Sequence, residues 1–429
     1  MPFLSNQANG GDRNIVSFRA RGHESGRGPL SFLRRNARSE NDLDALSKRI
    51  LLPSLPVSDE EMARATHQDR GQKLARQEMW EELSEQIQYA DDCRLSTPGG
   101  EIASMLLAFG ARSDVVAAAE DAIADGAVPD PSGIEALEEV QAEYFGDHCC
   151  ALVVAMAHID IGWAWRTAGS ANIQKNEECQ RHWLHHFNRA RDILAPHDGI
   201  DLDAPSLAAA QCALTAAFRQ KEHRVADDYQ KLIDLDPDGH RHMRALGQYM
   251  LPAHFGSYDT LELEARRTAS RTSDVWGDGG YAWVFFDALA LDRGALDLLD
   301  ADFFADGMRH ILEAKKDQHI TNLWAAFCAV SMAPNPEKRL SNRAEAARKR
   351  LHDCLDWILG DYLQELHPLI WSQALLSPGQ TPALPSRRAL INKGRQTALR
   401  IIATRFADEL AEGNSIAFSS AGMYRLPAL

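Results

Sequence analysis

Histidine, carboxylate and aromatic side chains are concentrated between positions 158 and 186, so this stretch is where the sequence is most able to do chemistry. His158 and Asp160 lie in a run that is otherwise apolar, where a carboxylate must find a partner or take up a raised pKa. His182 and His186 follow, four residues apart. Together these residues could form the centre of a hydrolase, with or without a metal. The sequence favours the alternative, a structural hydrogen bond or ion pair between neighbouring helices.

Two histidines at positions i and i+4 share one face of a helix and can both bind zinc. His182 and His186 are therefore the candidate metal ligands, but they flank the apolar stripe of Trp183 and Phe187, and the His-Glu-x-x-His arrangement is absent. This spacing favours a partly exposed helix edge, so we expect no metal. The glycine-rich segment at positions 277–280 lacks the Lys-Ser/Thr of a phosphate loop, and we expect no other cofactor.

Polar and aromatic residues elsewhere indicate a binding surface. Asp287 stands in the apolar stretch that begins at Trp283, and Tyr249 and His254 flank a proline further upstream. If the chain forms a concave groove, such residues would line it and contact a peptide or a small ligand. The residues predicted to line this groove are His158, Asp160, Trp163, Arg166, Tyr249, His254, Trp283 and Asp287.

The composition argues against several classes of protein. With a formal net charge of -15 over 429 residues, we expect no nonspecific binding to nucleic acid or to an anionic membrane. No stretch approaches the roughly 20 apolar residues of a membrane span, and the N-terminus lacks the pattern of a secretory signal. The cysteines form no pair of Cys-x-x-Cys dyads, and the adjacent Cys149 and Cys150 are expected to be buried thiols. We therefore expect a cytoplasmic protein with reduced thiols.

Helices must position these residues, because helical start and stop signals recur along most of the chain and alternating β-branched runs are missing. Ser58 opens a long polar helix to about Asp92, and Ser113 caps another. The run from Cys149 to Trp165 is apolar around nearly its whole circumference, so we expect it inside a stack of helices. The predicted domains are a disordered basic tail (1–40), an N-terminal helical region (41–130), an array of helical hairpins (131–370), and a C-terminal capping helix with a tail (371–429).

One pair of predicted helices carries a family resemblance. The segment from Tyr229 to Pro237 is similar to the second helix and terminal proline of a tetratricopeptide repeat, and Ser206 to Asp238 is close to the roughly 34-residue length of that repeat. The segment from Tyr249 to Glu262 resembles an uncharacterised bacterial helical-repeat family of unknown function. The resemblance implies an all-α fold of stacked antiparallel helical hairpins, a tetratricopeptide-like α-solenoid, but no activity. Leu384 to Glu412 would close this array as a long amphipathic helix.

Stacked helical hairpins typically present an extended concave surface to a peptide or protein. We therefore expect a noncatalytic scaffold or adaptor and, because the chain is acidic, a partner segment with basic and apolar side chains. The alternative is the hydrolase with its site near His158, Asp160, His182 and His186. A sensor or immunity-type protein that sequesters a toxin or regulator is a third hypothesis, which the sequence does not separate from the first. The oligomeric state stays open.

Overall fold

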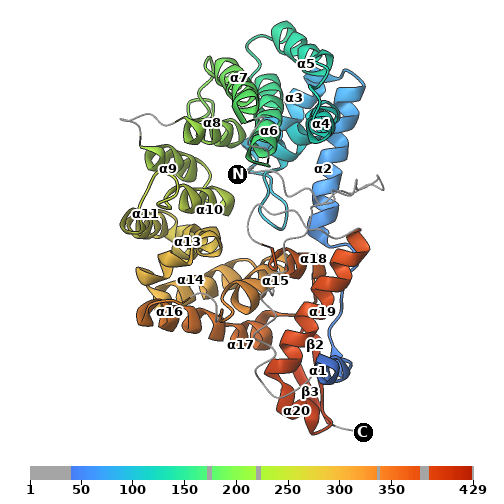
Figure 1. The fold of residues 1–429 in the computed structure, drawn as a ribbon, viewed down its shortest axis with the longest axis vertical. Helices are drawn as coiled ribbons and strands as arrows, with labels where there is room; N and C mark the ends of the chain where they lie inside the picture. The colour runs from blue at the N-terminus through green and yellow to red at the C-terminus, as the bar shows by residue number, and fades with distance from the viewer. Residues whose placement is uncertain (1–39, 172–175, 219–223, 336–338, 377–385, 428–429) are drawn as a thin grey trace. The chain divides into compact units, whose positions relative to one another are not determined.

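The structure is a computed structural model that describes residues 40–427 except for 172–175, 219–223, 336–338 and 377–385 (Figure 1). The predicted basic tail lies almost entirely outside these described residues. The described chain is mostly α-helical, as the sequence predicts. It divides into two compact units, one formed by Asp59–Tyr249 and the other by Met250–Leu429 together with the described residues before Asp59.

The helices described in the first unit are α2 (Asp59–Arg76), α3 (Trp80–Asp92), α4 (Ala103–Ala124), α5 (Ser132–Glu143), α6 (His148–Ala171), α7 (Asn176–Leu194), α8 (Pro205–Ala217), α9 (Val225–Leu235) and α10 (His240–Tyr249). Helix α6 packs most extensively on α7 and α4, and it also contacts α3, α5 and α8 (Figure 1). Helices α9 and α10 follow, each packed on the helix before it. The predicted N-terminal helical region (41–130) is therefore divided: its part from Asp59 onward belongs to this unit, and its residues before Asp59 belong to the second unit.

Helix α6 lies inside the first unit because it is apolar on nearly every side, as its sequence predicts. The small residues Ala151, Val153, Ala155 and Ala157 are completely buried, which lets the neighbouring helices approach closely. By length and composition α6 could also cross a membrane. In this structure 78% of its most apolar 18-residue stretch is buried inside the protein, as in the core helix of a globular domain.

Helices α2 and α4 touch backbone to backbone at two glycines. A Cβ atom on Gly71 would lie 2.0 Å from the carbonyl oxygen of Leu107, and a Cβ atom on Gly110 would lie 1.9 Å from that of Gln68. No side chain fits at either position unless the helices move apart. This contact positions α4, and with it Arg112, against the centre of the unit.

Two predicted helix boundaries differ from the structure. The polar helix predicted from Ser58 to Asp92 is interrupted at Glu78, whose φ of 56° lies in the left-handed region where α2 ends and before α3 begins. The residues at the end of α2 include no glycine, the residue type that usually indicates a helix end, so the sequence did not predict the interruption. Ser113 is not a helix cap, because α4 begins at Ala103 and the Ser113 hydroxyl donates to the carbonyl of Gly110 at 2.8 Å.

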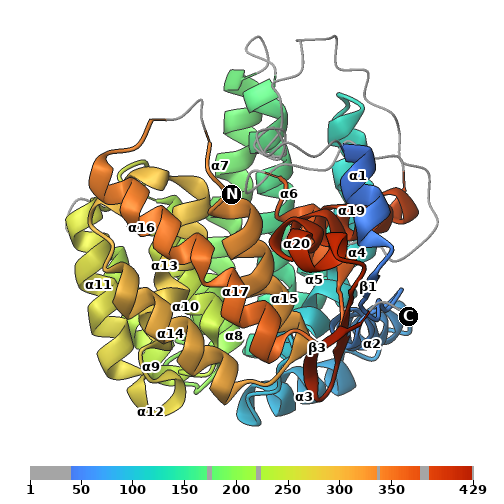
Figure 2. The same ribbon diagram turned by 90° about the horizontal axis from the view of Figure 1, so that it is seen from below.

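The elements described in the second unit are α1 (Glu40–Ser47), β1 (Ile50–Leu51), α11 (Tyr258–Arg271), α12 (Ser273–Trp276), α13 (Gly279–Leu291), α14 (Ala301–Ala314), α15 (Gln318–Ala326), α16 (Asn342–Asp353), α17 (Leu355–Trp357), α18 (Pro368–Gln373), α19 (Arg387–Arg405), α20 (Ala407–Ala411), β2 (Ser415–Ser419) and β3 (Gly422–Leu426). Helix α11 packs on α13, α13 on α14, and α14 on α16, so these helices stack in chain order (Figure 2). The boundary between the two units falls at Met250, within the array that the sequence predicts from 131 to 370.

The core of the second unit is a cluster of aromatic rings around Trp324. This side chain is completely buried, and its ring centroid lies 4.8 Å from that of Phe286 and 5.0 Å from that of Trp283. The rings of Phe304 and Phe327 lie 5.8 and 5.7 Å away. Because these residues come from α13, α14, α15 and the π-helix after it (Phe327–Ser331), the cluster joins successive segments of the chain.

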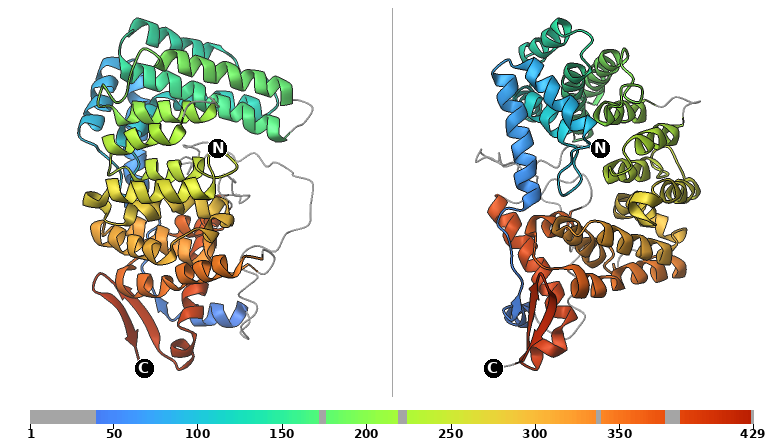
Figure 3. Two further views of the ribbon diagram at one scale, coloured as in Figure 1. Left: turned by 90° about the vertical axis from the view of Figure 1, so that its left-hand side faces the viewer. Right: turned by 180° about the vertical axis from the view of Figure 1, so that it is seen from behind.

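A small sheet, which the sequence does not predict, joins distant parts of the second unit. Strand β1 pairs in parallel with β2, with Ile50 opposite Ile416, and β2 pairs antiparallel with β3 in a hairpin (Figure 3). Ile416 and Phe418 turn inward and are buried. The C-terminal tail predicted after the capping helix is this hairpin.

The long helix predicted from Leu384 to Glu412 appears as α19 and α20, and its buried face matches the predicted one in part. Of the predicted stripe, Ile402 and Leu410 are buried, whereas Leu390, Ile391, Leu399 and Phe406 are half-buried. Thr397, Ala398 and Ile401 are buried as well. At Gly394, a Cβ atom would lie 1.7 Å from the carbonyl oxygen of Pro368. Close packing on α18 therefore selects small residues on this face.

Candidate functional site

Three side chains from neighbouring helices contact one another in series: Glu138 from α5, His158 from α6 and His186 from α7. His158 Nε2 lies 3.1 Å from Glu138 Oε1, and His158 Nδ1 lies 3.0 Å from His186 Nδ1. Arg189, one turn after His186 on α7, donates from Nε to the same oxygen of Glu138 at 2.8 Å. The structure thus brings together two of the histidines that the sequence singles out, and it adds a carboxylate and an arginine.

These contacts determine which ring nitrogens carry protons. A carboxylate only accepts hydrogen bonds, so His158 Nε2 donates to Glu138. In a neutral imidazole the other nitrogen then accepts, so His158 Nδ1 accepts from the Nδ1–H of His186. The remaining nitrogen of His186, Nε2, is left with a lone pair that is able to accept a proton.

Both histidines are neutral near pH 7. Burial lowers the pKa of His158 to about 3, and the positive charge of Arg189 acts in the same direction. Burial also lowers the pKa of His186 to about 3, with a further contribution from His158. These side-chain contacts therefore link a neutral histidine pair to the Glu138–Arg189 ion pair.

Asp160 pairs with a charge on a neighbouring helix rather than with the histidines. Arg112 on α4 donates from Nε to Asp160 Oδ2 at 2.7 Å, and its guanidinium carbon lies 5.2 Å from the ring centroid of Phe109. The Arg112 side chain is completely buried, and its two Nη atoms meet no acceptor among the described residues. Burial raises the pKa of Asp160, and Arg112 offsets part of that shift. A buried pair of this kind is costly to break from one side.

Trp163 and Arg166 pack together further along α6. The guanidinium group of Arg166 lies 4.7 Å from the ring centroid of Trp183 and 5.5 Å from that of Trp163. The ring of His182 stacks on Trp165, with centroids 4.3 Å apart and planes 13° apart. His182 therefore contacts Trp165, whereas His186, the other candidate metal ligand, contacts His158.

The other predicted groove residues lie further along the chain. Tyr249 ends the first unit and stacks on Tyr229, with ring centroids 5.7 Å apart. His254, Trp283 and Asp287 belong to the second unit. Trp283 is completely buried in the aromatic core, so it does not line a surface, whereas His254 and Asp287 are half-buried.

An acidic depression in the second unit was not among the predicted sites. It has a volume of about 500 Å³ and lies between α11, the segment that leads into α14, and the start of α16. Carboxylates outnumber arginines two to one in its lining, which consists of Asp259, Glu262, Asp300, Asp302, Arg266 and Arg343 with Leu298, Leu299 and Ala301.

One arginine shows how this acidic depression holds a guanidinium group. Arg266 donates to Glu262 Oε1 at 2.7 Å and to Asp300 Oδ2 at 3.0 Å. Its guanidinium carbon also lies 5.5 Å from the ring centroid of Tyr281 and 5.3 Å from that of Phe303. Burial acts to raise the pKa of Asp300, but the Phe303 amide and Arg266 outweigh it and lower the pKa.

Two carboxylates at the rim of the acidic depression remain exposed. Asp259 lies in the first turn of α11, and the side chain of Asp302 is 81% exposed although it pairs with Arg350 at 2.7 Å. In the sequence, both residues are acidic side chains in the first turn of a helix. Such residues are common because they stabilise the helix, whether or not they bind a ligand. Their convergence depends on the packing of α11 against its neighbours, so no local signal revealed it.

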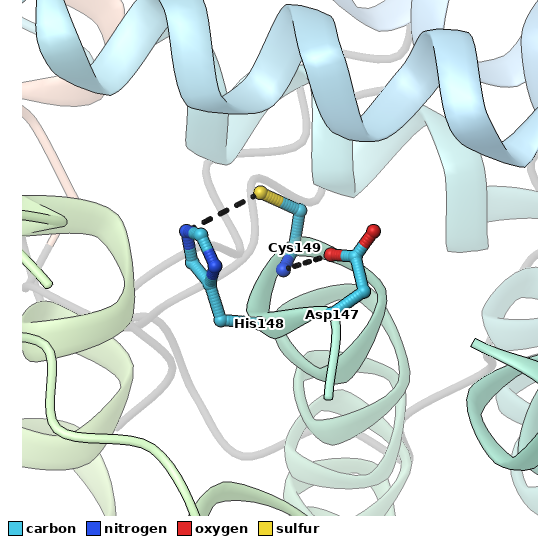
Figure 4. Close-up of side chains that lie close together, drawn as sticks. All are labelled: Asp147, His148 and Cys149. Carbon is cyan, nitrogen blue, oxygen red and sulfur yellow. Dashed lines mark hydrogen bonds between the residues drawn. The ribbon is translucent and has the colours of Figure 1, made fainter. Parts of the chain in front are cut away.

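Asp147, His148 and Cys149 lie together at the start of α6 (Figure 4). Their oxygen, nitrogen and sulfur atoms all lie within 4.8 Å of one another. Asp147 Oδ1 accepts from the backbone N–H groups of Cys149 at 2.7 Å and of Cys150 at 3.1 Å, and so caps the helix. The two cysteines are buried free thiols, as predicted, and burial raises the pKa of both, that of Cys150 to about 11.

The sequence revealed the polar residues of α6 but not their partners. Arg112 carries a signal of its own, because it is a charged residue in the mostly apolar run of α4. Glu138 carries none, because it is one of several acidic residues on the amphipathic helix α5. The pairing of His158 with His186 also depends on how α6 and α7 pack, which helical spacing alone does not determine.

Comparison with known proteins adds no relative. No protein-family model matches the sequence, and no curated protein or solved structure matches it. The chemistry of these sites therefore follows from their own geometry.

Proposed function

We propose that this protein is a noncatalytic helical-repeat scaffold that binds a protein or peptide segment with basic and apolar side chains. The observation that carries the proposal is the acidic depression, where two carboxylates and two aromatic rings already hold the guanidinium group of Arg266. An incoming arginine or lysine would meet the exposed carboxylates of Asp259 and Asp302, the second of which also pairs with Arg350.

The order of packing supports a tetratricopeptide-like solenoid as the scaffold. In the second unit α11, α13, α14 and α16 each pack on the next, and in the first unit α6 to α10 do the same. Nearest-neighbour stacking of this kind builds extended surfaces that hold peptides or proteins. The net charge of -15 favours a basic partner, and the free cysteines fit a reducing cytoplasm.

Fluorescence anisotropy tests this function with a labelled peptide that alternates arginine and leucine. The matched control is the same peptide with glutamate in place of arginine. We expect the wild-type protein to bind the arginine peptide, and binding to weaken as salt is added. The substitutions Asp259→Asn and Asp302→Asn should each weaken binding roughly fivefold, the effect of about 1 kcal/mol for an exposed charge pair.

An exposed carboxylate elsewhere provides the matched control for these variants. Asp114 pairs with Arg76 on the surface of the first unit, so Asp114→Asn removes one exposed charge without touching the acidic depression. We expect Asp114→Asn to leave peptide binding unchanged. Equal binding of the arginine and glutamate peptides, or an equal effect of Asp114→Asn and Asp302→Asn, would overturn the assignment of the partner to this site.

The lone pair on His186 Nε2 favours a second candidate function, a hydrolase. His158 and Glu138 hold the neutral imidazole of His186 in place, as a general base requires, but its pKa of about 3 makes it a weak base near pH 7, so the hydrolase ranks second. The test is turnover of a panel of activated carboxylic and phosphate esters. Activity that is lost in His186→Gln and kept in His182→Gln would support this function, and no turnover by the wild-type protein would count against it.

A further inference from the structure

We propose that Asp147, His148 and Cys149 bind a divalent transition-metal ion at the start of α6, with Zn²⁺ as the best match. These three consecutive residues supply a carboxylate, an imidazole and a thiol, and their donor atoms all lie within 4.8 Å of one another. Zinc takes this mixture of oxygen, nitrogen and sulfur ligands, and the thiol excludes the hard ions Mg²⁺ and Ca²⁺ as preferred occupants. This inference is independent of the peptide site in the second unit.

Two of the donor atoms already stand at the separation of two zinc ligands. His148 Nε2 lies 3.5 Å from Cys149 Sγ, and both atoms lie on the same side of the first turn (Figure 4). In a tetrahedral site with Zn–N near 2.0 Å and Zn–S near 2.3 Å, the nitrogen and sulfur atoms are about 3.6 Å apart. An ion that bridges them therefore needs little rearrangement of either side chain.

The helix itself holds the third donor. The backbone N–H groups of Cys149 and Cys150 donate to Asp147 Oδ1, so the carboxylate is fixed beside the two other donors. Metal-bound carboxylates are commonly oriented by such outer hydrogen bonds. The same residues that cap α6 thus preorganise the site.

A carboxylate stands beside the buried thiol. Cys149 is 2% exposed, and Asp147 supplies an oxygen ligand next to it. A thiol binds a metal ion as the thiolate, so each ion that binds should release the proton of Cys149.

A structural zinc site has four protein ligands, whereas a site with three leaves a position for water. The three donors of this cluster therefore predict an ion with one position open to water.

Cobalt(II) titration of the full-length protein, purified under reducing conditions without chelator, tests this site. Co²⁺ in place of Zn²⁺ reports a thiolate ligand by a charge-transfer absorption in the near ultraviolet and tetrahedral geometry by intense visible bands. We expect both signals to saturate at one ion per chain and Zn²⁺ to abolish them. The affinity should rise with pH, because the thiol must lose its proton.

The adjacent thiol offers a matched control. Cys150 Sγ contacts Ser84 rather than His148, so Cys150→Ser should keep the charge-transfer absorption. Cys149→Ala should abolish it, and His148→Gln should weaken Co²⁺ binding by at least about tenfold. Circular dichroism of each variant checks that the helices persist, and His148→Gln, at a half-buried position, covers the case in which Cys149→Ala unfolds.

The proposal is wrong if the wild-type protein gives no thiolate-to-cobalt absorption. It is also wrong if Cys149→Ala, or His148→Gln where Cys149→Ala unfolds, leaves that absorption unchanged, since the ion then binds elsewhere. In either case the contact between His148 and Cys149 is only a side-chain hydrogen bond.

Discussion

The two units bury different kinds of side chain. The first unit has a neutral histidine pair and the Arg112–Asp160 ion pair at its central helix, whose other buried side chains are apolar. The second unit fills its centre with aromatic rings around Trp324 and keeps its main group of carboxylates at the surface. The centre of the first unit should therefore respond to pH and to the loss of single charges, whereas the aromatic centre of the second should respond mainly to a change in side-chain volume.

The largest effect is expected in the aromatic core of the second unit. Trp324→Ala removes a completely buried ring that contacts several others, and we expect a loss of about 5 kcal/mol, the upper end of the range for such truncations. Urea unfolding followed by circular dichroism measures it. Phe145→Ala, at an aromatic residue that is 79% exposed, is the control and should change the midpoint little.

A somewhat smaller effect is expected when the buried ion pair of the first unit is broken from one side. Asp160→Ala leaves the buried guanidinium of Arg112 without its carboxylate, and we expect a loss of about 3 kcal/mol or more. The double variant Arg112→Met with Asp160→Leu should recover most of this loss, because an apolar pair carries no unpaired charge. If the double variant is no more stable than Asp160→Ala, the loss comes from packing and not from the buried charge.

Lowering the pH should destabilise the first unit because His158 and His186 are neutral in the folded protein. Their pKa values of about 3 in the folded protein lie below the usual value near 6.5 in the unfolded chain, so the unfolded chain binds more protons between these limits. The stability that the neutral pair contributes is complete above pH 6.5 and declines as the pH falls toward 3, by up to about 1.4 kcal/mol per pH unit for each histidine. Denaturant unfolding between pH 7 and pH 5 measures this slope.

A matched pair of variants tests the source of the acid effect. His158→Gln together with His186→Gln should flatten the dependence on pH, whereas His185→Gln, at an exposed position on the same helix, should keep it. If the slope persists without His158 and His186, other groups carry it.

The smallest effect on stability is expected at the rim of the acidic depression. Asp302→Asn removes a charge from a side chain that is 81% exposed, so we expect the free energy of unfolding to change by less than about 0.5 kcal/mol. Thermal unfolding measures this, and peptide binding by the same variant should fall severalfold. A large loss of stability would show that Asp302 is structural and would remove it from the binding site.

Much of the helical structure could be predicted from residue spacing. The run that became α6 was expected inside a stack because it is apolar on nearly every side, and it is indeed buried. The break at Glu78 escaped prediction because a left-handed residue that is not glycine leaves no signal in the sequence. The sheet escaped because β1 and β2 are short and pair across most of the chain, as at Ile50 and Ile416.

The candidate sites were less predictable than the helices, because each depends on a partner from another helix. His158 was singled out as a polar residue in an apolar run, but nothing in the sequence pairs it with Glu138. The acidic depression combines residues of α11 with residues near α14 that are some 40 positions away. Only the metal-ligand cluster at Asp147 to Cys149 is contiguous, so its residue types could have revealed it directly.

Hydrogen exchange on the full-length protein, with and without the arginine and leucine peptide, tests most directly whether the acidic depression is the binding site. If it is, the peptide should slow exchange in α11 (Tyr258–Arg271) and at the start of α14 (Ala301–Ala314), and leave α6 and α7 unchanged. Slowed exchange that is confined to α6 and α7 would place the partner in the first unit and contradict the proposed function of the acidic depression.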